Sequence, residues 1–175
     1  MSMLEQWLAQ EEAQRQRTSH GPGPGILDPA IVKQLTGMEL IQGILNGTLP
    51  HAALAKTLDF LMLEAEPGRT LFQGAPSEKH LNPMGVIHGG WFASILDSAL
   101  GCAIITRMEP GQAFTTVELS VNIVRALSPA IQRVRAEAQV LHCGRQLATA
   151  EARLTGPDGK LYAHATTTCL VYKVP

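Results

Sequence analysis

Apolar side chains between residues 91 and 104 recur at steps of three and four, which is the periodicity of an α-helix. They cover most of the circumference, so the sequence predicts a long helix buried almost all round. One charged residue, Asp97, interrupts them, with small residues at 93, 94 and 101 on the same face. We expect this helix to be the centre of the fold, with room for a ligand beside Asp97. The apolar positions are Trp91, Phe92, Ile95, Leu96, Ala99, Leu100, Ala103 and Ile104.

A two-residue period on both sides of this helix indicates β-strands. Residues 58–66 and 69–74 flank a Pro67-Gly68 pair, which is typical of two strands joined by a tight turn. Alternation over residues 115–123 predicts a half-buried antiparallel strand, with Thr115 on the apolar core face and Thr116 on the other. Further strands are expected over 131–141, 146–154 and 160–172. The resulting fold class is α+β, an antiparallel sheet wrapped around one long central helix.

The first 55 residues predict helices and no nameable chemistry. Residues 1–17 place Leu4, Trp7 and Leu8 on one helical face, residues 20–25 form a Gly-Pro linker, and Asp28-Pro29 is typical of a capped helix start. Another helix over 38–45 should end at Asn46-Gly47. Glutamate balances arginine in the first helix, which favours packing on protein over a membrane surface. We expect an N-terminal helical extension over 1–55 and the main domain over 56–175.

Composition narrows the function classes. Lysine plus arginine at 14 against aspartate plus glutamate at 15 gives a net charge of −1 over 175 residues, which disfavours nucleic acid and anionic membranes as partners. Three widely spaced cysteines without a CxxC pair argue against a disulfide framework or a zinc site. The sequence has neither a secretory signal pattern nor an apolar run of membrane-spanning length. We therefore expect a cytoplasmic protein.

Two features around the central helix carry candidate chemistry. A carboxylate on a core helix is costly unless it is paired or chemically used, so Asp97 is the first candidate. Gly89 and Gly90 stand where the helix begins, and a helix N-terminus presents free N–H groups and a positive dipole end. Without a Cβ at these positions, a substrate carbonyl can approach closely enough for its developing oxyanion to be stabilised.

These residues belong to a longer motif, H-x-N-P-x-G-x-x-H-G-G from residue 80, followed six residues later by L-D-S-A-x-G. The motif resembles the signature of hotdog-fold acyl-CoA thioesterases of the PaaI-like family. The resemblance extends from about Thr57 to Val174 and includes TTVELSVNIVRA and HATTTCLVYK. It implies that Asn82 orients the substrate or the attacking water, and that the Thr116 hydroxyl binds water or the carboxylate.

His88 is most simply a buried or half-buried histidine that fixes the loop at the substrate site through a backbone hydrogen bond, and a direct catalytic role is the alternative. His80, His88 and Asp97 do not have the spacing of a recognised metal set, so neither a metal nor another cofactor is expected. The catalytic candidates are thus Asp97, Gly89 and Asn82. The substrate-binding candidates are His88, Gly90 and Thr116.

The spacing of two candidates predicts an oligomer. Gly89 and Asp97 are eight residues apart, roughly 12 Å along a helix, so one thioester carbon cannot contact both within one chain. If both act on one acyl group, they come from different subunits of a homodimer. The family resemblance implies the same composite site, usually in a dimer of dimers.

The predicted activity is hydrolysis of an aryl- or medium-chain acyl-CoA, with Asp97 as general base or as nucleophile. Met84, Trp91, Phe92 and Ile95 are candidates to line the acyl pocket. Arg125, Arg133 and Arg145 are candidates for the CoA phosphates. Two alternatives stay open. A hotdog-fold enoyl- or hydroxyacyl-CoA hydratase or dehydratase usually shows a catalytic histidine paired with an acid, which this helix lacks, and a non-catalytic acyl-CoA-binding protein would not need Asp97.

Overall fold

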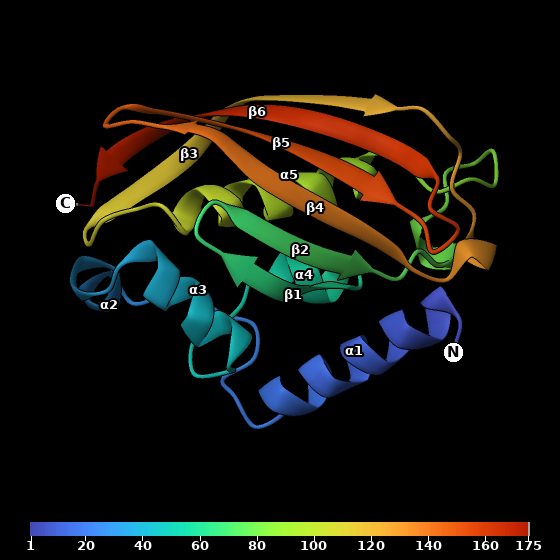
Figure 1. Ribbon diagram of the computed structural model, residues 1–175, viewed down its shortest axis with the longest axis horizontal. Helices are drawn as coiled ribbons and strands as arrows, with labels where there is room; N and C mark the ends of the chain where they lie inside the picture. Colours follow the sequence, from blue (N-terminus) through green and yellow to red (C-terminus); the bar gives the residue numbers. More distant parts are fainter. Residues whose placement is uncertain (175) are drawn as a thin grey trace.

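The computed structural model describes residues 1–174 and contains one antiparallel sheet that curls around a long helix (Figure 1). The strand order is β1-β2-β4-β5-β6-β3, which leaves β1 and β3 at the edges. The predicted α+β architecture is confirmed. The strands are β1 (Phe60–Glu66), β2 (Arg69–Gly74), β3 (Gln112–Ile123), β4 (Val134–Cys143), β5 (Leu147–Thr155) and β6 (Leu161–Lys173), and the helices are α1 (Met3–Thr18), α2 (Pro29–Gln34), α3 (Gly37–Leu45), α4 (Ala53–Thr57) and α5 (Gly89–Ile105).

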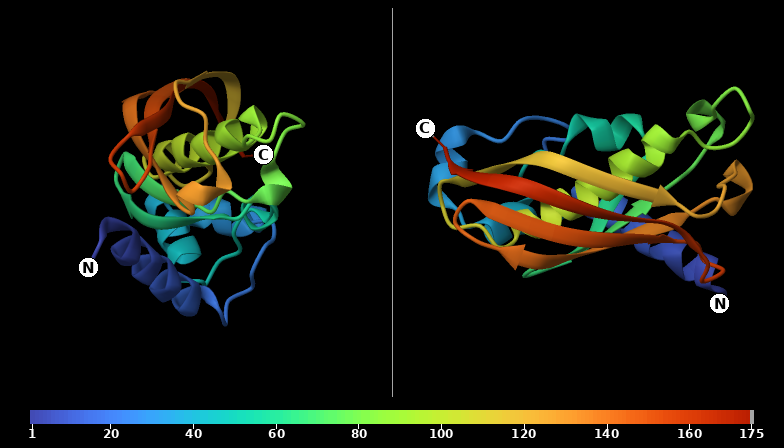
Figure 2. Two further views of the ribbon diagram at one scale, coloured as in Figure 1. Left: turned by 90° about the vertical axis from the view of Figure 1, so that its right-hand side faces the viewer. Right: turned by 90° about the horizontal axis from the view of Figure 1, so that it is seen from above.

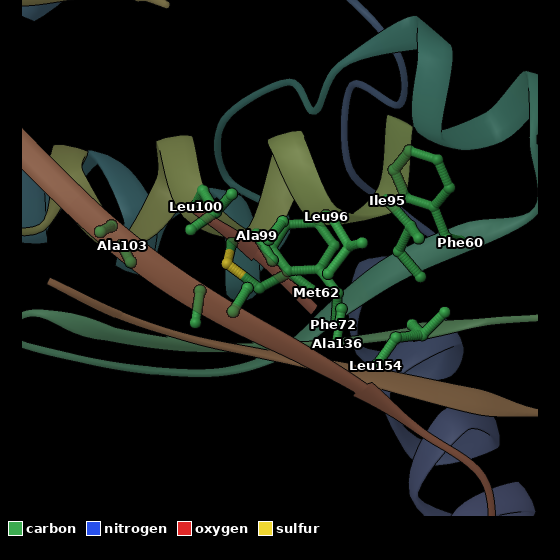
Figure 3. Packing of buried hydrophobic residues seen from close by; sticks show 14 of the residues in the cluster. Phe60, Met62, Phe72, Ile95, Leu96, Ala99, Leu100, Ala103, Ala136 and Leu154 are labelled. Atoms are coloured by element: carbon green, nitrogen blue, oxygen red, sulfur yellow. The ribbon is translucent and has the colours of Figure 1, made fainter. Parts of the chain in front are cut away.

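Helix α5 is the predicted central helix, and the sheet encloses it when the molecule is viewed end on (Figure 2). Ile95, Leu96 and Leu100 are completely buried, and they meet side chains of β1 and β2 in the core (Figure 3). The strands opposite present mainly alanines, whose small side chains let the sheet lie close to the helix. The buried alanines are Ala136, Ala138, Ala148, Ala150, Ala152, Ala163 and Ala165.

The β1–β2 hairpin forms as predicted around Pro67-Gly68. Gly68 has a φ of +87°, a conformation that this kind of turn requires and that glycine adopts without strain. The first strand is shorter than the predicted 58–66, because α4 extends to Thr57 and β1 begins only at Phe60.

Strand β3 departs from the strict alternation that the sequence predicted. A β-bulge lies between Thr116 and Glu118, and an extra residue in a strand reverses which side chains face the core on the two sides of it. Val117 is therefore 59% exposed. Thr115 is exposed as well, so its predicted place in the core is wrong, whereas Thr116 faces α5 and is partly buried.

Helix α1 lies on the far side of the β1–β2 hairpin from α5 (Figures 1 and 2). Helix α3 instead reaches the end of α5, where the Gly37 N–H donates to the Met108 carbonyl at 2.9 Å. Helices α2 and α3 form where predicted, and Asp28 caps α2 through the Ala30 N–H at 2.8 Å. The division between residues 55 and 56 stays a prediction. Within residues 1–174, no helix has the length and apolar character needed to cross a membrane.

Helix α1 docks on the protein itself, but through a more polar face than the predicted one. Trp7 is buried as expected, while Glu11 and Gln14 are buried beside it. The Glu11 carboxylate pairs with Arg133 and accepts a hydrogen bond from the Gln73 side chain at 2.8 Å. Burial opposes the charge of Glu11, but these hydrogen bonds outweigh it and lower the pKa of the carboxyl.

Candidate active site

The loop before α5 is held in shape by Asn82. Its side-chain oxygen accepts the Met84 N–H at 2.9 Å and the Val86 N–H at 3.3 Å. These two donors fix the orientation of the amide, so its NH2 group points away from them. That NH2 group donates no hydrogen bond within residues 1–174. Asn82 therefore stabilises the loop with one atom and keeps two donors for a ligand.

His88 is the N-cap of α5, and its ring accepts one of the N–H groups at the start of the helix. The Gly90 N–H donates to His88 Nδ1 at 2.9 Å, so in the neutral ring the proton is on Nε2. The predicted loop-fixing hydrogen bond of His88 is thus present in the structure, but the predicted burial of His88 is wrong, because the side chain is exposed at the start of the helix. Gly90 uses its N–H inside the chain, whereas the Gly89 N–H meets no acceptor in residues 1–174. Gly89 is accordingly the better oxyanion donor of the two glycines.

Asn82 and Gly89 line one pocket of about 350 Å³ at the start of α5. Its walls are mostly apolar and come from the loop, from α5 and from the end of β3. An added Cβ at Gly89 would meet only the tip of Ile123, at 3.4 Å. The other lining residues are Val86, Ile87, Phe92, Ile123, Val124, Arg125 and Ala126.

Asp97 lies two turns further along α5, facing β3. Its Oδ1 accepts a hydrogen bond from the Thr116 hydroxyl at 3.2 Å. Burial raises the pKa of the Asp97 carboxyl above its usual value, and the Thr116 hydrogen bond partly offsets that rise. The carboxylate is half-buried, less enclosed than the sequence predicted. A partly desolvated carboxylate beside a hydroxyl can accept a proton from water or attack a carbonyl carbon.

Within one chain the structure brings the candidates together as two groups. Asn82 and Gly89 share a pocket, and Asp97 and Thr116 share a hydrogen bond, but neither Asp97 nor Thr116 lines that pocket. This separation agrees with the 12 Å estimate from helix rise.

Of the predicted acyl-pocket residues, Phe92 alone lines this pocket. Ile95 is completely buried in the core, and Met84 is 85% exposed on the loop. Trp91 is buried, and it borders a second pocket of about 410 Å³ on the other side of the first turn of α5. The full lining of the second pocket is Leu58, Lys79, His80, Leu81, His88, Gly90, Trp91 and Ser94.

His80 is the residue whose environment the sequence did not indicate. It is 7% exposed and stacks on Trp91 with 5.7 Å between ring centroids. Its Nε2 is buried without a hydrogen-bond partner in the described part of the chain, and burial lowers the pKa of the ring. Its carbonyl accepts the His88 N–H at 2.8 Å, so it also anchors the start of α5. These contacts join residues eight to eleven positions apart, and no local periodicity reports them.

Comparison with known proteins shows which family the chain resembles. Residues 84–163 match the family model of the thioesterase superfamily. A 1,4-dihydroxy-2-naphthoyl-CoA hydrolase of Listeria monocytogenes is 24% identical over 120 residues, which are 69% of this chain and 96% of that protein.

Solved structures give the same result. A phenylacetic acid degradation-related protein from Ralstonia eutropha is 26% identical, with a TM-score of 0.69 over 75% of this chain and 98% of its own. A variant of the phenylacetic acid degradation protein PaaI from Thermus thermophilus is 27% identical, with a TM-score of 0.60 over 67% of this chain and 96% of its own. A thioesterase family protein from Silicibacter pomeroyi is 28% identical, with a TM-score of 0.64 over 69% and 90% of the two chains.

A long helix wrapped by an antiparallel sheet, with a carboxylate and a glycine-marked helix start, therefore defines a hotdog-fold thioester hydrolase. The chain resembles the thioesterase superfamily over residues 84–163, and its fold is similar to those of PaaI-like proteins.

Proposed function

We propose that the protein hydrolyses an acyl-CoA thioester, with an aryl or medium-chain acyl group, to the free acid and CoA. The observation that carries the proposal is the pair of complementary groups on α5: a free N–H at Gly89 and a carboxylate at Asp97. One can stabilise negative charge on the carbonyl oxygen, and the other can activate water or attack the carbonyl carbon. The Listeria relative, named for hydrolysis of an aryl-CoA, supports the aryl alternative.

The two groups act together in a homodimer. Strand β3 is an edge strand whose outer side has no partner strand within residues 1–174, and it exposes Val117 and Ile123. An exposed apolar edge of this kind favours pairing with another strand. A two-fold axis beside β3 and α5 would bring the Asp97 carboxylate of one subunit to the Gly89 pocket of the other, and would create two equal sites.

The chemistry then follows from these positions. The thioester carbonyl oxygen accepts the Gly89 N–H, aided by the helix dipole and by the Asn82 amide. In one route, the Asp97 carboxylate of the other subunit takes a proton from water as the water oxygen bonds to the carbonyl carbon. The C–S bond then breaks, and the thiol leaves with that proton. In the other route, the carboxylate itself attacks and releases the thiolate, and water hydrolyses the mixed anhydride. Thr116 holds the carboxylate in either route.

A panel of aryl- and straight-chain acyl-CoA substrates tests the proposal, with thiol release followed by a thiol-reactive dye. We expect release from at least one substrate, and a loss of on the order of a hundredfold or more in Asp97→Asn. Hydration or dehydration of the acyl chain without thiol release would identify a hydratase or dehydratase instead. Tight binding of acyl-CoA without either reaction would identify a binding protein.

A further inference from the structure

Arg125 is the one charged residue among the described residues that line the Asn82–Gly89 pocket. It lies two residues after the end of β3, where the backbone is held in place. The N–H groups of Val124 and Arg125 both donate to the Tyr162 carbonyl, at 2.9 and 3.1 Å. The rest of the pocket wall is apolar apart from Asn82 and Gly89, and a cation beside apolar walls interacts more strongly with an anion than one in open water does.

The other candidate arginines are unsuited to this pocket. The Arg133 guanidinium is committed to the buried Glu11 carboxylate of α1. Arg145 lies at the turn between β4 and β5 and lines neither pocket. Arg125 itself has no carboxylate within 4 Å in residues 1–174. The charges of Asp158 and Arg125 both act on the pKa of the Tyr162 hydroxyl, so Asp158 is the carboxylate to consider as a partner of Arg125. Asp158 is paired with Lys160 instead, at 2.9 Å.

We infer that Arg125 is the anion-binding side chain of the substrate pocket, and that it binds either a CoA phosphate or a carboxylate at the far end of the acyl group. Because the side chain is exposed, its guanidinium can face outward toward a phosphate or inward toward a carboxylate. Both anions offer paired oxygens that a guanidinium binds in bidentate fashion. The inference rests on the proposed function for the identity of the substrate.

Binding of CoA to the full chain tests whether Arg125 binds a CoA phosphate, and it requires no turnover. Calorimetry compares CoA with pantetheine, which has the same arm but no phosphates, in wild type, Arg125→Gln and the matched control Arg145→Gln. If a phosphate is bound, Arg125→Gln weakens CoA binding about tenfold or more and leaves pantetheine binding unchanged. Arg145→Gln behaves as wild type, and added salt reduces the difference between wild type and Arg125→Gln.

Kinetics test whether Arg125 binds a carboxylate at the far end of the acyl group. A dicarboxylic acyl-CoA is compared with its methyl ester, which has the same length and no terminal charge. If the acyl carboxylate is bound, Arg125→Gln raises KM for the acid about tenfold or more while KM for the ester and both kcat values are unchanged. Arg125→Lys keeps the charge without the planar fork and gives an intermediate KM, which also controls for misfolding of the glutamine variant.

Wild-type behaviour of Arg125→Gln toward CoA and toward both acyl-CoA substrates would overturn the inference. Failure of the proposed function is a different result. Absence of hydrolysis, together with CoA binding that depends on Arg125, would reject the hydrolase and retain the anion site.

Discussion

Subunit complementation tests the composite site most directly. Asn82 belongs to the Gly89 half of the site and Asp97 to the half contributed by the other subunit, so Asn82→Ala and Asp97→Asn damage different halves. In a mixed dimer, one site has both defects and the other has none. Random exchange between equal amounts makes half of the dimers mixed, each with one intact site of two, so activity should reach about a quarter of wild type. If each parent retains about 1%, the rise is about 25-fold.

The assay is thiol release after co-refolding of differently tagged chains, with double-tag purification to show that mixed dimers form. The matched control combines Asp97→Asn with Thr116→Val. Because the Thr116 hydroxyl bonds to Asp97 within one chain, both substitutions damage the same half and no intact site can arise. That mixture should stay at the mean of its parents. Mixed dimers of the first pair that are no more active than their parents would refute the composite site.

Three further predictions concern single substitutions. Gly89→Pro removes the free N–H at a helix position where proline fits, after an extended His88 (ψ 138°), so kcat should fall on the order of a hundredfold, and further than in Gly89→Ala, which keeps the N–H. Thr116→Val removes a hydrogen bond that lowers the pKa of Asp97, so the acid limb of a kcat/KM–pH profile should move to higher pH, and an unmoved limb would contradict the role of Asp97. Glu11→Gln should lower the free energy of unfolding by about 1–3 kcal/mol without changing kcat. Because the folded pKa of Glu11 is lowered, the stability it contributes is present above its ordinary pKa of 4.5 and is lost as pH falls through the folded value, so urea titrations should show no difference between wild type and Glu11→Gln in strong acid.

The central helix α5 and the place of Asp97 on it were predictable, because both depend on local periodicity and on residue chemistry. The apolar repeat from Trp91 to Ile104 is long enough to exclude a strand, and Asp97 is its one charged member. The Pro67-Gly68 turn and the Asp28 cap involve neighbours within four residues, so their side-chain and backbone preferences appear directly in the sequence. The sheet around a central helix and the helices α1, α2 and α3 were predictable on these grounds, and the resemblance to hotdog-fold thioesterases implied the same arrangement.

Other features depend on contacts between distant residues. The bulge at Val117 arises from the pairing of β3 with β6, and alternation by itself contains no record of an extra residue, so Thr115 was assigned to the wrong face. Trp91 and Ile95 are apolar and could line a pocket or a core. Only the strands that surround them decide that Ile95 is core and that Trp91 borders a second pocket.

By itself, the sequence determined which elements form and which side chains can do chemistry on α5, because both follow from residue type and short-range spacing. Only the tertiary structure decided which of those groups are free to act. His88 takes up the Gly90 N–H and leaves that of Gly89, and Glu11 takes up Arg133 from 122 positions away and leaves Arg125. A buried charge or donor is stable only with a partner, and the partner is chosen by the fold rather than by neighbours in the chain.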